Sequence, residues 1–253
     1  MRSLASRHLL PILQAAGRAA VGLVYPPTCS ACGGATGEPH ALCAGCWRGL
    51  RFIERPYCER LGTPFAVDHG APLLSPAAIA DPPVFDRARA VAHYDDTARA
   101  LVHRLKYGDR PDLARALGRM MASAGAELLP AADVIVPVPL HRLRLWRRRF
   151  NQAMALGRVV SALSGRPCDP FLLARVKRTE AQVGLTKAQR RDNLQGAFRV
   201  PAEARARLAG KRVLLVDDVL TTGATANACS RALIRGGAAA VDVLAFARVV
   251  TEA

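Results

Sequence analysis

The chain lacks an uninterrupted apolar run of the length that a membrane-spanning helix requires, about 20 residues. In the N-terminal segment 1–24, Pro11, Gln14, Arg18 and two glycines interrupt the apolar residues. No continuous apolar stretch precedes a small-residue cleavage site, which disfavours a secretory signal peptide. We therefore expect no stable membrane insertion, and we expect 1–24 to form a short, partly amphipathic leader helix that packs on the domain after it.

The sequence also lacks two common nucleotide-binding signatures. No G-x-G-x-x-G follows an expected strand and no G-x-x-x-x-G-K-[ST] occurs, which argues against a dinucleotide-binding fold and a P-loop ATPase. Aromatic residues are scarce, at 5%, and leave few stacking platforms for single-stranded nucleic acid.

Acidic residues are few beside the basic ones. The chain has 20 Asp and Glu against 36 Lys and Arg, a formal net charge of +16. This excess favours anionic partners such as pyrophosphate-bearing substrates, nucleic acid or anionic lipid, but it does not define a fold. Arginine dominates lysine and alanine is abundant, a pattern that compositional drift also produces. The 51% hydrophobic content of 253 residues suffices for one substantial core with a small appendage.

Seven cysteines are an odd number for a disulfide framework, and a reducing, cytoplasmic compartment fits them best. Four of them form two C-x2-C pairs separated by ten residues: Cys29, Cys32, Cys43 and Cys46. Two such pairs at this spacing predict a structural zinc site, because tetrahedral zinc takes four thiolates and then has no open position for catalysis. A redox pair and unliganded structural cysteines are the alternatives.

The remaining cysteines are scattered. Cys58 follows the second pair by twelve residues, and it is either a substitute ligand or a buried residue. Cys168 and Cys229 are expected in the core, because cysteine behaves there as a small hydrophobe.

Composition divides the chain into four segments. We expect the leader helix at 1–24, a zinc-ribbon module at 25–66, a proline-rich linker at 67–83 and an α/β domain at 84–253. In the last segment strand and helix patterns alternate, which is typical of a parallel sheet flanked by helices. The expected strands are 89–94, 134–138, 172–176, 213–216 and 241–248, and the expected helices are 97–106, 113–128, 152–163 and 224–235.

The most informative segment is 211–225, KRVLLVDDVLTTGAT. An apolar strand, Val213–Val216, leads into Asp217 and Asp218, then into a small-residue loop, and a helical pattern follows. Loop N–H groups and Thr hydroxyls at a helix N-terminus bind phosphate, and carboxylates accept hydrogen bonds from vicinal ribose hydroxyls. The segment resembles the phosphoribosyl-pyrophosphate (PRPP) loop of type I phosphoribosyltransferases. A solvated strand end, or the carboxylate pair of another doubly wound enzyme, is the alternative.

A zinc ribbon followed by a PRPP-type loop resembles the ComF family of phosphoribosyltransferase-like proteins, which is linked to bacterial competence and DNA uptake. Internal blocks extend the resemblance over nearly the whole chain: HRLKYGD at 103–109, PVPLHR at 137–142, FNQ at 150–152, and the basic block Arg175–Phe198. The resemblance implies a type I phosphoribosyltransferase-like parallel sheet with a small N-terminal double zinc-ribbon-like module. This chain departs from the family at Leu61, where a further C-x-x-C would have its second cysteine, and at Arg149, which replaces a glycine.

The resemblance also implies roles for individual residues. Asp217 and Asp218 would hold the ribose hydroxyls. The 5′-phosphate would lie on Thr221, Thr222, Gly223, Ala224 and Thr225. Pyrophosphate, with Mg²⁺ on its oxygens, would lie on the loop Pro137, Val138 and Pro139 at a strand end.

Candidate cations for the leaving group are Lys106, Arg142, Arg148 and Arg190. Lys106 and Arg190 join the two aspartates as the expected catalytic set. A solvated arginine face is the alternative for the arginines, and a cation at a helix C-terminus is the alternative for Lys106. His103 and His141 are more typical of packing residues than of bases. The polar part of 175–198 is expected to form a mobile hood over the ligand.

Three functions remain open on this reading. The first is a phosphoribosyltransferase, a pentosyl-transferring glycosyltransferase, acting on an unidentified acceptor. The second is a non-catalytic PRPP- or nucleotide-sensing module that contacts single-stranded DNA or a competence helicase. The third is a zinc-ribbon nucleic-acid binder that retains a vestigial enzyme fold. The sequence does not indicate an oligomeric state.

Overall fold

The computed structural model describes residues 26–38, 41–68, 70–107, 111–140, 150–177 and 193–250. Its helices are α2 (Ala44–Arg48), α3 (Pro76–Ala80), α4 (Asp96–Tyr107), α5 (Pro111–Ala124), α7 (Gln152–Ser164), α9 (Arg205–Leu208) and α10 (Ala224–Arg235), with 3-10 turns η1 (Leu129–Ala131) and η2 (Ala202–Ala204). Its strands are β1 (Ala88–His93), β2 (Val134–Pro137), β3 (Ala174–Arg175), β4 (Phe198–Arg199), β5 (Arg212–Leu220) and β6 (Ala240–Arg248).

The centre of the molecule is a four-stranded sheet in the order β1-β6-β5-β2. All three pairings are parallel, which confirms the predicted parallel sheet. Every residue of β6 is buried, because helices cover both faces of the sheet. A strand that is buried on both faces has a nearly continuous apolar sequence rather than an alternating one.

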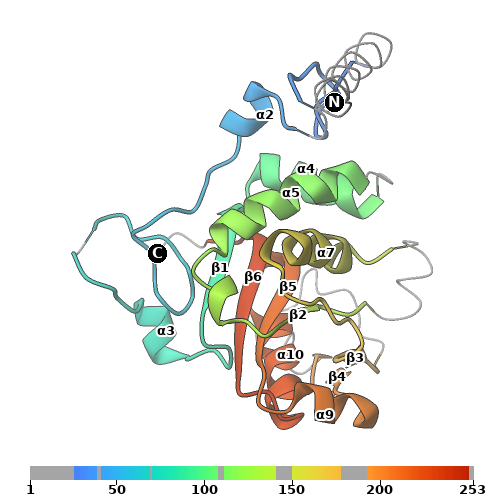
Figure 1. Ribbon diagram of the computed structural model, residues 1–253. Helices are drawn as coiled ribbons and strands as arrows, with labels where there is room; N and C mark the ends of the chain where they lie inside the picture. The colour runs from blue at the N-terminus through green and yellow to red at the C-terminus, as the bar shows by residue number, and fades with distance from the viewer. Residues whose placement is uncertain are drawn as a thin grey trace, which may run out of the picture.

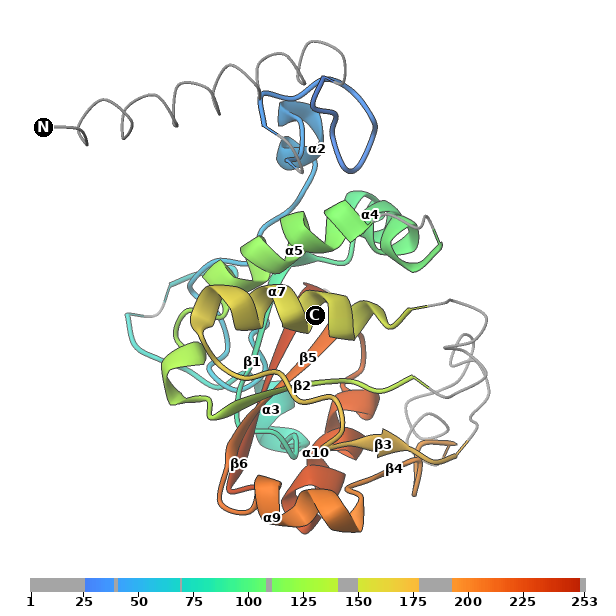
Figure 2. The same ribbon diagram turned by 45° about the vertical axis from the view of Figure 1, so that its right-hand side comes forward.

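Helices lie on both faces of this sheet (Figures 1 and 2). Successive strand residues point to opposite faces, so Leu214 and Val216 pack with the helices α5 and α7. Their neighbours Val213 and Leu215 pack with α10 on the other face. The carboxyl ends of all four strands therefore meet at one edge, where α10 begins after β5.

Three elements differ from their predicted bounds by more than one residue. Strand β5 continues to Leu220 because β6 offers pairing partners beyond Val216, as far as Arg248. The strand expected at 172–176 is short and pairs antiparallel with β4, outside the main sheet. The free edge of β2 is instead bordered by 167–169, where Cys168 bridges Ile135. Helix α5 ends at Ala124 rather than 128, and turns fill the interval before η1.

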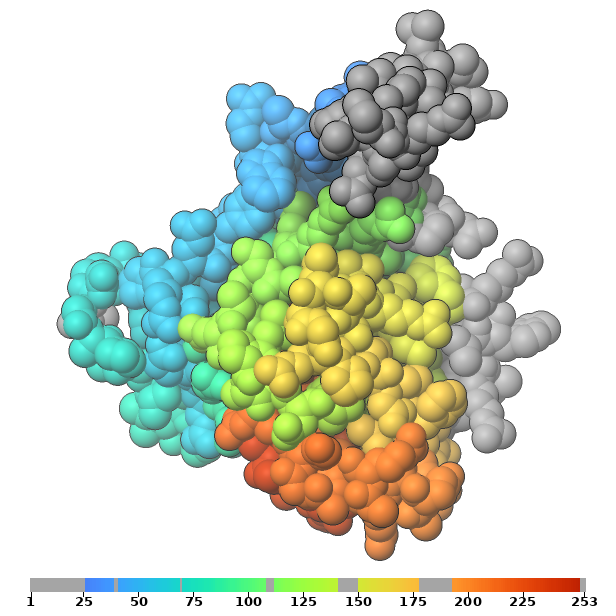
Figure 3. All heavy atoms as spheres, viewed as in Figure 1, coloured from blue at the N-terminus to red at the C-terminus, as the bar shows by residue number. Residues whose placement is uncertain are grey.

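Two small lobes precede the sheet. The first lobe, residues 26–50 with α2, lies on α4 and stands out from the body (Figures 1 and 3). Its Leu50 shares a core with Leu101 of α4. The second lobe, residues 51–81 with α3, runs along β1 and bonds to it through the backbone, with Ile53 N–H to the Val91 carbonyl at 2.9 Å.

No helix in the described part of the chain is both long enough and apolar enough to cross a bilayer.

Candidate ligand site and metal centre

The acidic pair lies within β5 rather than in a loop after it. Asp218 is buried, with 8% of its surface exposed, and Asp217 is partly buried. The N–H of Asp218 donates to Oδ1 of Asp217 at 2.8 Å. Because Asp217 pairs in register with Ala245 of β6, the strand pairing fixes the backbone that carries both carboxyl groups.

The two carboxyl groups are neighbours, and Asp218 influences the ionisation of Asp217. Burial and then the charge of Asp218 raise the pKa of Asp217 to about 7, although Lys106 and the Asp218 N–H oppose the shift. Asp217 is therefore partly protonated at neutral pH. Its carboxyl group is able both to accept hydrogen bonds from hydroxyl groups and to donate one.

A cation from another element completes the acidic pair. Nζ of Lys106, in the last turn of α4, lies 2.9 Å from Oδ2 of Asp218. Lys106 was predicted as a cation for the leaving group, and the structure brings it next to Asp218; its role toward a ligand stays a prediction. The alternative, that Lys106 only complements the negative end of its helix, does not account for the ion pair.

The loop after β5 leads directly into α10. Gly223 is the residue before the helix and has φ of 77°, a conformation that favours glycine over residues with a Cβ. Thr221 and Thr222 are exposed, and Thr225 in the first turn is partly buried. No side chain caps the first turn from the Gly223 position, which leaves the positive end of a twelve-residue helix beside the aspartates.

The end of β2 lies beside the same edge. Pro137 is the register partner of Val216, and the N–H of Val138 donates to the Val216 carbonyl at 2.9 Å. The side-chain amide of Asn151 donates to the Val138 carbonyl at 3.0 Å and also caps α7 through the Ala153 N–H. The structure thus brings Pro137, Val138 and Pro139 next to the acidic strand. From the sequence we named the FNQ block but did not assign these contacts to Asn151, although an Asn directly before a helical pattern indicates an N-cap.

Several predicted site residues lie outside the described residues. These are Arg142, Arg148 and Arg190, together with His141, Arg149 and most of the expected hood. They remain predictions.

The four paired cysteines form one cluster. The sulfurs of Cys29, Cys32, Cys43 and Cys46 all lie within 4.8 Å of one another, with 3.6 Å between Cys32 and Cys43. Thiolates at 2.3 Å from a tetrahedral zinc ion stand about 3.8 Å apart, so the donor set fits zinc. A closed set of four thiolates supports a structural metal.

Backbone groups prepare this cluster for a metal. Sγ of Cys29 accepts the N–H groups of Ala31, Cys32 and Cys43. Burial opposes ionisation of Cys29, but these hydrogen bonds outweigh it and lower its pKa to about 6. Burial and the neighbouring sulfurs raise the pKa of Cys46. Metal binding would displace the protons that the four thiols share.

Helix α4 connects the metal centre with the acidic pair. Arg104 of this helix donates to the carbonyl of Ala31, which lies between Cys29 and Cys32 in the sequence. Two residues further along the helix, Lys106 forms the ion pair with Asp218. The contact of Arg104 was not predicted, since nothing in the sequence places the first lobe on this helix.

Comparisons with known proteins agree with this architecture. The phosphoribosyl transferase domain family matches residues 155–251, and the double zinc ribbon domain family matches residues 20–77. Fold and cysteine cluster therefore define a protein with a zinc ribbon and a phosphoribosyltransferase domain, as the sequence predicted.

Curated relatives narrow the class. Competence protein F of Haemophilus influenzae is 32% identical over 216 residues, covering 83% of this chain and 91% of the relative. DNA utilization protein YhgH of Escherichia coli K12 is 32% identical over 217 residues with the same coverage, and competence protein ComFC of Bacillus subtilis is 26% identical over 206 residues. The chain belongs to this ComF family of competence and DNA utilization proteins.

Among solved structures, a glutamine PRPP amidotransferase from B. subtilis, complexed with ADP and GMP, has 22% identity and a TM-score of 0.38. The match covers 55% of this chain and 29% of that enzyme.

Proposed function

We propose that the protein binds PRPP with Mg²⁺ at the carboxyl edge of β5 and transfers its phosphoribosyl group to an acceptor. The observation that carries the proposal is the meeting of four elements at one edge. Lys106 of α4 forms an ion pair with Asp218 beside Asp217 on β5, and both the loop before α10 and the end of β2 adjoin the two aspartates. Ligands bind outside the carboxyl ends of strands in open parallel sheets.

Each part of PRPP has a chemically suited partner there. The aspartate pair accepts hydrogen bonds from the 2′- and 3′-hydroxyls. The N-terminus of α10 and the Thr hydroxyls receive the 5′-phosphate. The pyrophosphate lies toward Pro137–Pro139, with the charge of Lys106 close by, and Mg²⁺ supplies charge neutralisation on its oxygens. Arg142, Arg148 and Arg190 are the further proposed cations.

Transfer requires that the bond between C1 of the ribose and pyrophosphate breaks, and that its electron pair leaves with pyrophosphate. The acceptor's lone pair then forms the new bond to C1, and its proton passes to solvent or base. The ribosyl transition state carries positive charge, which the Asp217–Asp218 pair stabilises electrostatically. Lys106 stabilises the opposite charge on the leaving group, and the fixed loop orients the ribose.

Thermal unfolding with ligand fragments tests this binding mode. We expect PRPP with Mg²⁺ to raise the unfolding temperature more than ribose 5-phosphate or pyrophosphate alone, because it engages all three parts of the site. Pyrophosphate release across a panel of bases and nucleosides then tests transfer. Binding without release for any acceptor would leave a PRPP-sensing protein, and no stabilisation by any of the three compounds would overturn the proposal.

The names of the relatives suggest the cellular role. Because related chains are a competence protein and a DNA utilization protein, we propose that this chain acts in DNA uptake. A cytoplasmic location fits the seven free cysteines of the described residues.

One observation favours a second candidate function, the binding of single-stranded DNA. Three hollows of about 400, 420 and 660 Å³ lie beside the paired strands β3 and β4. The 420 Å³ hollow shares Phe198 and Arg235 with the 400 Å³ hollow, and it shares Arg199, Val200 and Arg205 with the 660 Å³ hollow. Arg231 and Arg235 line the 400 Å³ hollow. No ion pair between described residues engages these two arginines, whereas Arg207 nearby pairs with Asp169 at 2.8 Å.

A charge reversal tests this candidate against a matched control. Arg231 and Arg235 stand four residues apart on α10, and Arg115 and Arg119 have the same spacing on the exposed face of α5. Anisotropy with a labelled single-stranded oligonucleotide should show salt-dependent binding that Arg231→Glu/Arg235→Glu weakens far more than Arg115→Glu/Arg119→Glu. Equal losses in the two variants would assign the effect to net charge alone.

A further inference from the structure

The second lobe repeats the backbone of the first. In the first lobe the N–H of Cys32 donates to Sγ of Cys29 at 3.5 Å. In the second lobe the N–H of Leu61 donates to Sγ of Cys58 at 3.4 Å. The glycine that follows each turn, Gly33 or Gly62, has positive φ and bonds back to the carbonyl of the first cysteine, at 2.9 and 2.7 Å.

The flanking backbone repeats as well. An antiparallel bridge joins Thr28 to Ala35 around the first turn, and an equivalent bridge joins Tyr57 to Pro64 around the second. Each pair brackets its cysteine turn at the same spacing, so Cys58 and Leu61 occupy the positions of Cys29 and Cys32.

The other half of each ribbon also corresponds. Cys43 and Ser75 each precede a five-residue helix, α2 or α3. The side chain of each accepts the N–H three residues on, from Cys46 and Ala78 respectively. The backbone N–H of each donates to the first cysteine of its own lobe, in both cases at 3.2 Å.

The equivalents of the four zinc ligands are thus Cys58, Leu61, Ser75 and Ala78. Two of these side chains carry no ligand atom, and the third is a hydroxyl already engaged as a cap. Cys58 itself is fully buried, with 0% exposure. The double zinc ribbon match includes both lobes, at residues 20–77, but among the residues that the structure describes, a cluster of four donors for zinc occurs only in the first.

We infer that the second lobe is a zinc ribbon that keeps its fold without metal, so that the chain carries one zinc ion rather than two. Protein contacts replace the metal as the link that holds this lobe closed. This inference goes beyond the proposed function and does not depend on it.

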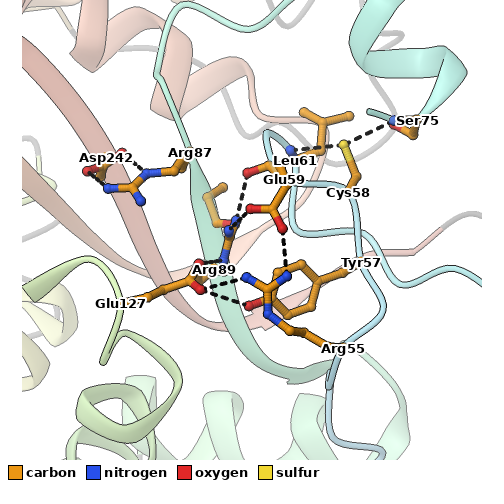
Figure 4. Close-up of polar contacts among 11 residues, drawn as sticks. Arg55, Tyr57, Cys58, Glu59, Leu61, Ser75, Arg87, Arg89, Glu127 and Asp242 are labelled. Carbon is orange, nitrogen blue, oxygen red and sulfur yellow. Dashed lines mark hydrogen bonds and ion pairs between the residues drawn. The ribbon is translucent and has the colours of Figure 1, made fainter. Parts of the chain in front are cut away.

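Two buried arginines from the main sheet, Arg89 and Arg248, hold the lobe. Figure 4 shows the contacts of Arg89. Arg89 of β1 is 3% exposed, and it donates to the backbone carbonyl of Glu59 at 2.8 Å and to its carboxylate at 2.9 Å. It also pairs with Glu127, which Arg55 of the lobe contacts at 2.9 Å. Arg248 of β6, 7% exposed, donates to the Leu61 carbonyl at 2.5 Å.

These contacts connect the metal-free lobe to the candidate ligand site. Arg248 is the register partner of Leu220, the residue directly before the Thr221–Thr225 loop. From the other side, the N–H of Val84 donates to Oδ1 of Asn227 in the first turn of α10 at 2.7 Å. The second lobe and the segment after it therefore support both ends of the loop with protein contacts alone.

Zinc content of the purified chain tests the inference. We expect about one zinc per wild-type chain, none in Cys29→Ser/Cys32→Ser, and one in Cys58→Ser, since four thiolates complete a structural site. Two zinc ions per wild-type chain, or loss of zinc in folded Cys58→Ser, would overturn it. The triple variant Leu61→Cys/Ser75→Cys/Ala78→Cys should bind a second zinc, and a folded triple variant with one zinc would contradict the equivalence of the two lobes.

Hydrogen exchange on the wild-type chain provides a test without substitution. After chelation of zinc, we expect amides of 28–48 to lose protection while those of 55–78 keep it, because only the first lobe depends on metal. Equal loss of protection in both lobes would overturn the inference.

Discussion

Lys106 and Asp218 form an ion pair of 2.9 Å between the end of α4 and the carboxyl-terminal part of β5. Both side chains are mostly buried, with 23% and 12% exposed. The contact ties the helix that carries the first lobe to the candidate ligand site, and it places a positive charge where we propose the leaving pyrophosphate to lie.

Replacing Lys106 with Met should weaken PRPP binding about tenfold or more. The substitution removes the cation from Asp218, so it also raises the pKa of Asp217, which Lys106 holds down. Calorimetric titration measures the affinity, and Lys211→Met is the control because Lys211 is exposed at the opposite end of β5. Equal affinity of Lys106→Met and the control would remove Lys106 from the site.

Replacing Asp217 with Asn should stabilise the ligand-free protein at alkaline pH. The raised pKa, about 7 against 3.8, means that the folded state holds a proton which the unfolded chain has released. The free energy of unfolding of the wild-type chain therefore falls as the pH rises from 3.8 to about 7, and the neutral amide of Asn avoids this loss. We expect a gain on the order of 1–2 kcal/mol at about pH 8 that shrinks toward about pH 5.5. Urea unfolding at the two pH values measures it, and a variant less stable than wild type at the higher pH would contradict the electrostatic account.

Replacing Gly223 with Ala should cost about 1–2 kcal/mol of stability and also weaken phosphate binding. An added Cβ has room, since its nearest neighbours are 3.9 Å away, so the cost comes from φ of 77°. Gly210→Ala is a matched control, with φ of 70° and open space but at the start of β5. Both variants should lose similar stability by urea unfolding, and only Gly223→Ala should lose affinity for PRPP. An equal loss of affinity in both would mean that the loop has no direct role.

Replacing Arg89 with Met should destabilise the protein by about 2–3 kcal/mol, because it removes the nearly buried cation between Glu59 and Glu127 and leaves these carboxylates only the more exposed Arg55 as an ion-pair partner. Arg99→Met removes one member of an exposed pair with Asp96 and should cost less than about 0.5 kcal/mol. Chemical unfolding compares them. Similar small costs would mean that the network of Figure 4 does not hold the second lobe.

Local patterns were sufficient to predict the four strands of the main sheet and the helices α4, α5, α7 and α10, but not the short elements β4 and α9. The helix Ala224–Arg235 has the predicted bounds, because Gly223 and Gly236 mark both of its ends. The cysteine cluster also follows from spacing alone. In each case the signal lies within a few residues of the element that it defines.

Contacts between segments that are distant in the sequence could not be predicted from local patterns. The length of β5 depends on its register with β6, and the position of Arg104 depends on how the first lobe packs. The family resemblance already marked the incomplete cysteine turn at Cys58 and Leu61, whereas the equivalence of Ser75 and Ala78 to Cys43 and Cys46 became evident only from the fold, because these residues keep the backbone but not the ligand chemistry. The resemblance pointed to both Lys106 and Asp218 as site residues, whereas the ion pair between them became evident only from the fold.

The most direct test of the account is a calorimetric titration of PRPP with Mg²⁺ into the zinc-loaded chain and into Asp217→Asn/Asp218→Asn. We predict saturable binding at one site per wild-type chain and an affinity at least about a hundredfold lower in the double variant, since the ribose loses both charged acceptors. The absence of saturable heat from folded wild-type protein, or equal affinity in the two proteins, would contradict the assignment of this strand edge as a phosphoribosyl site.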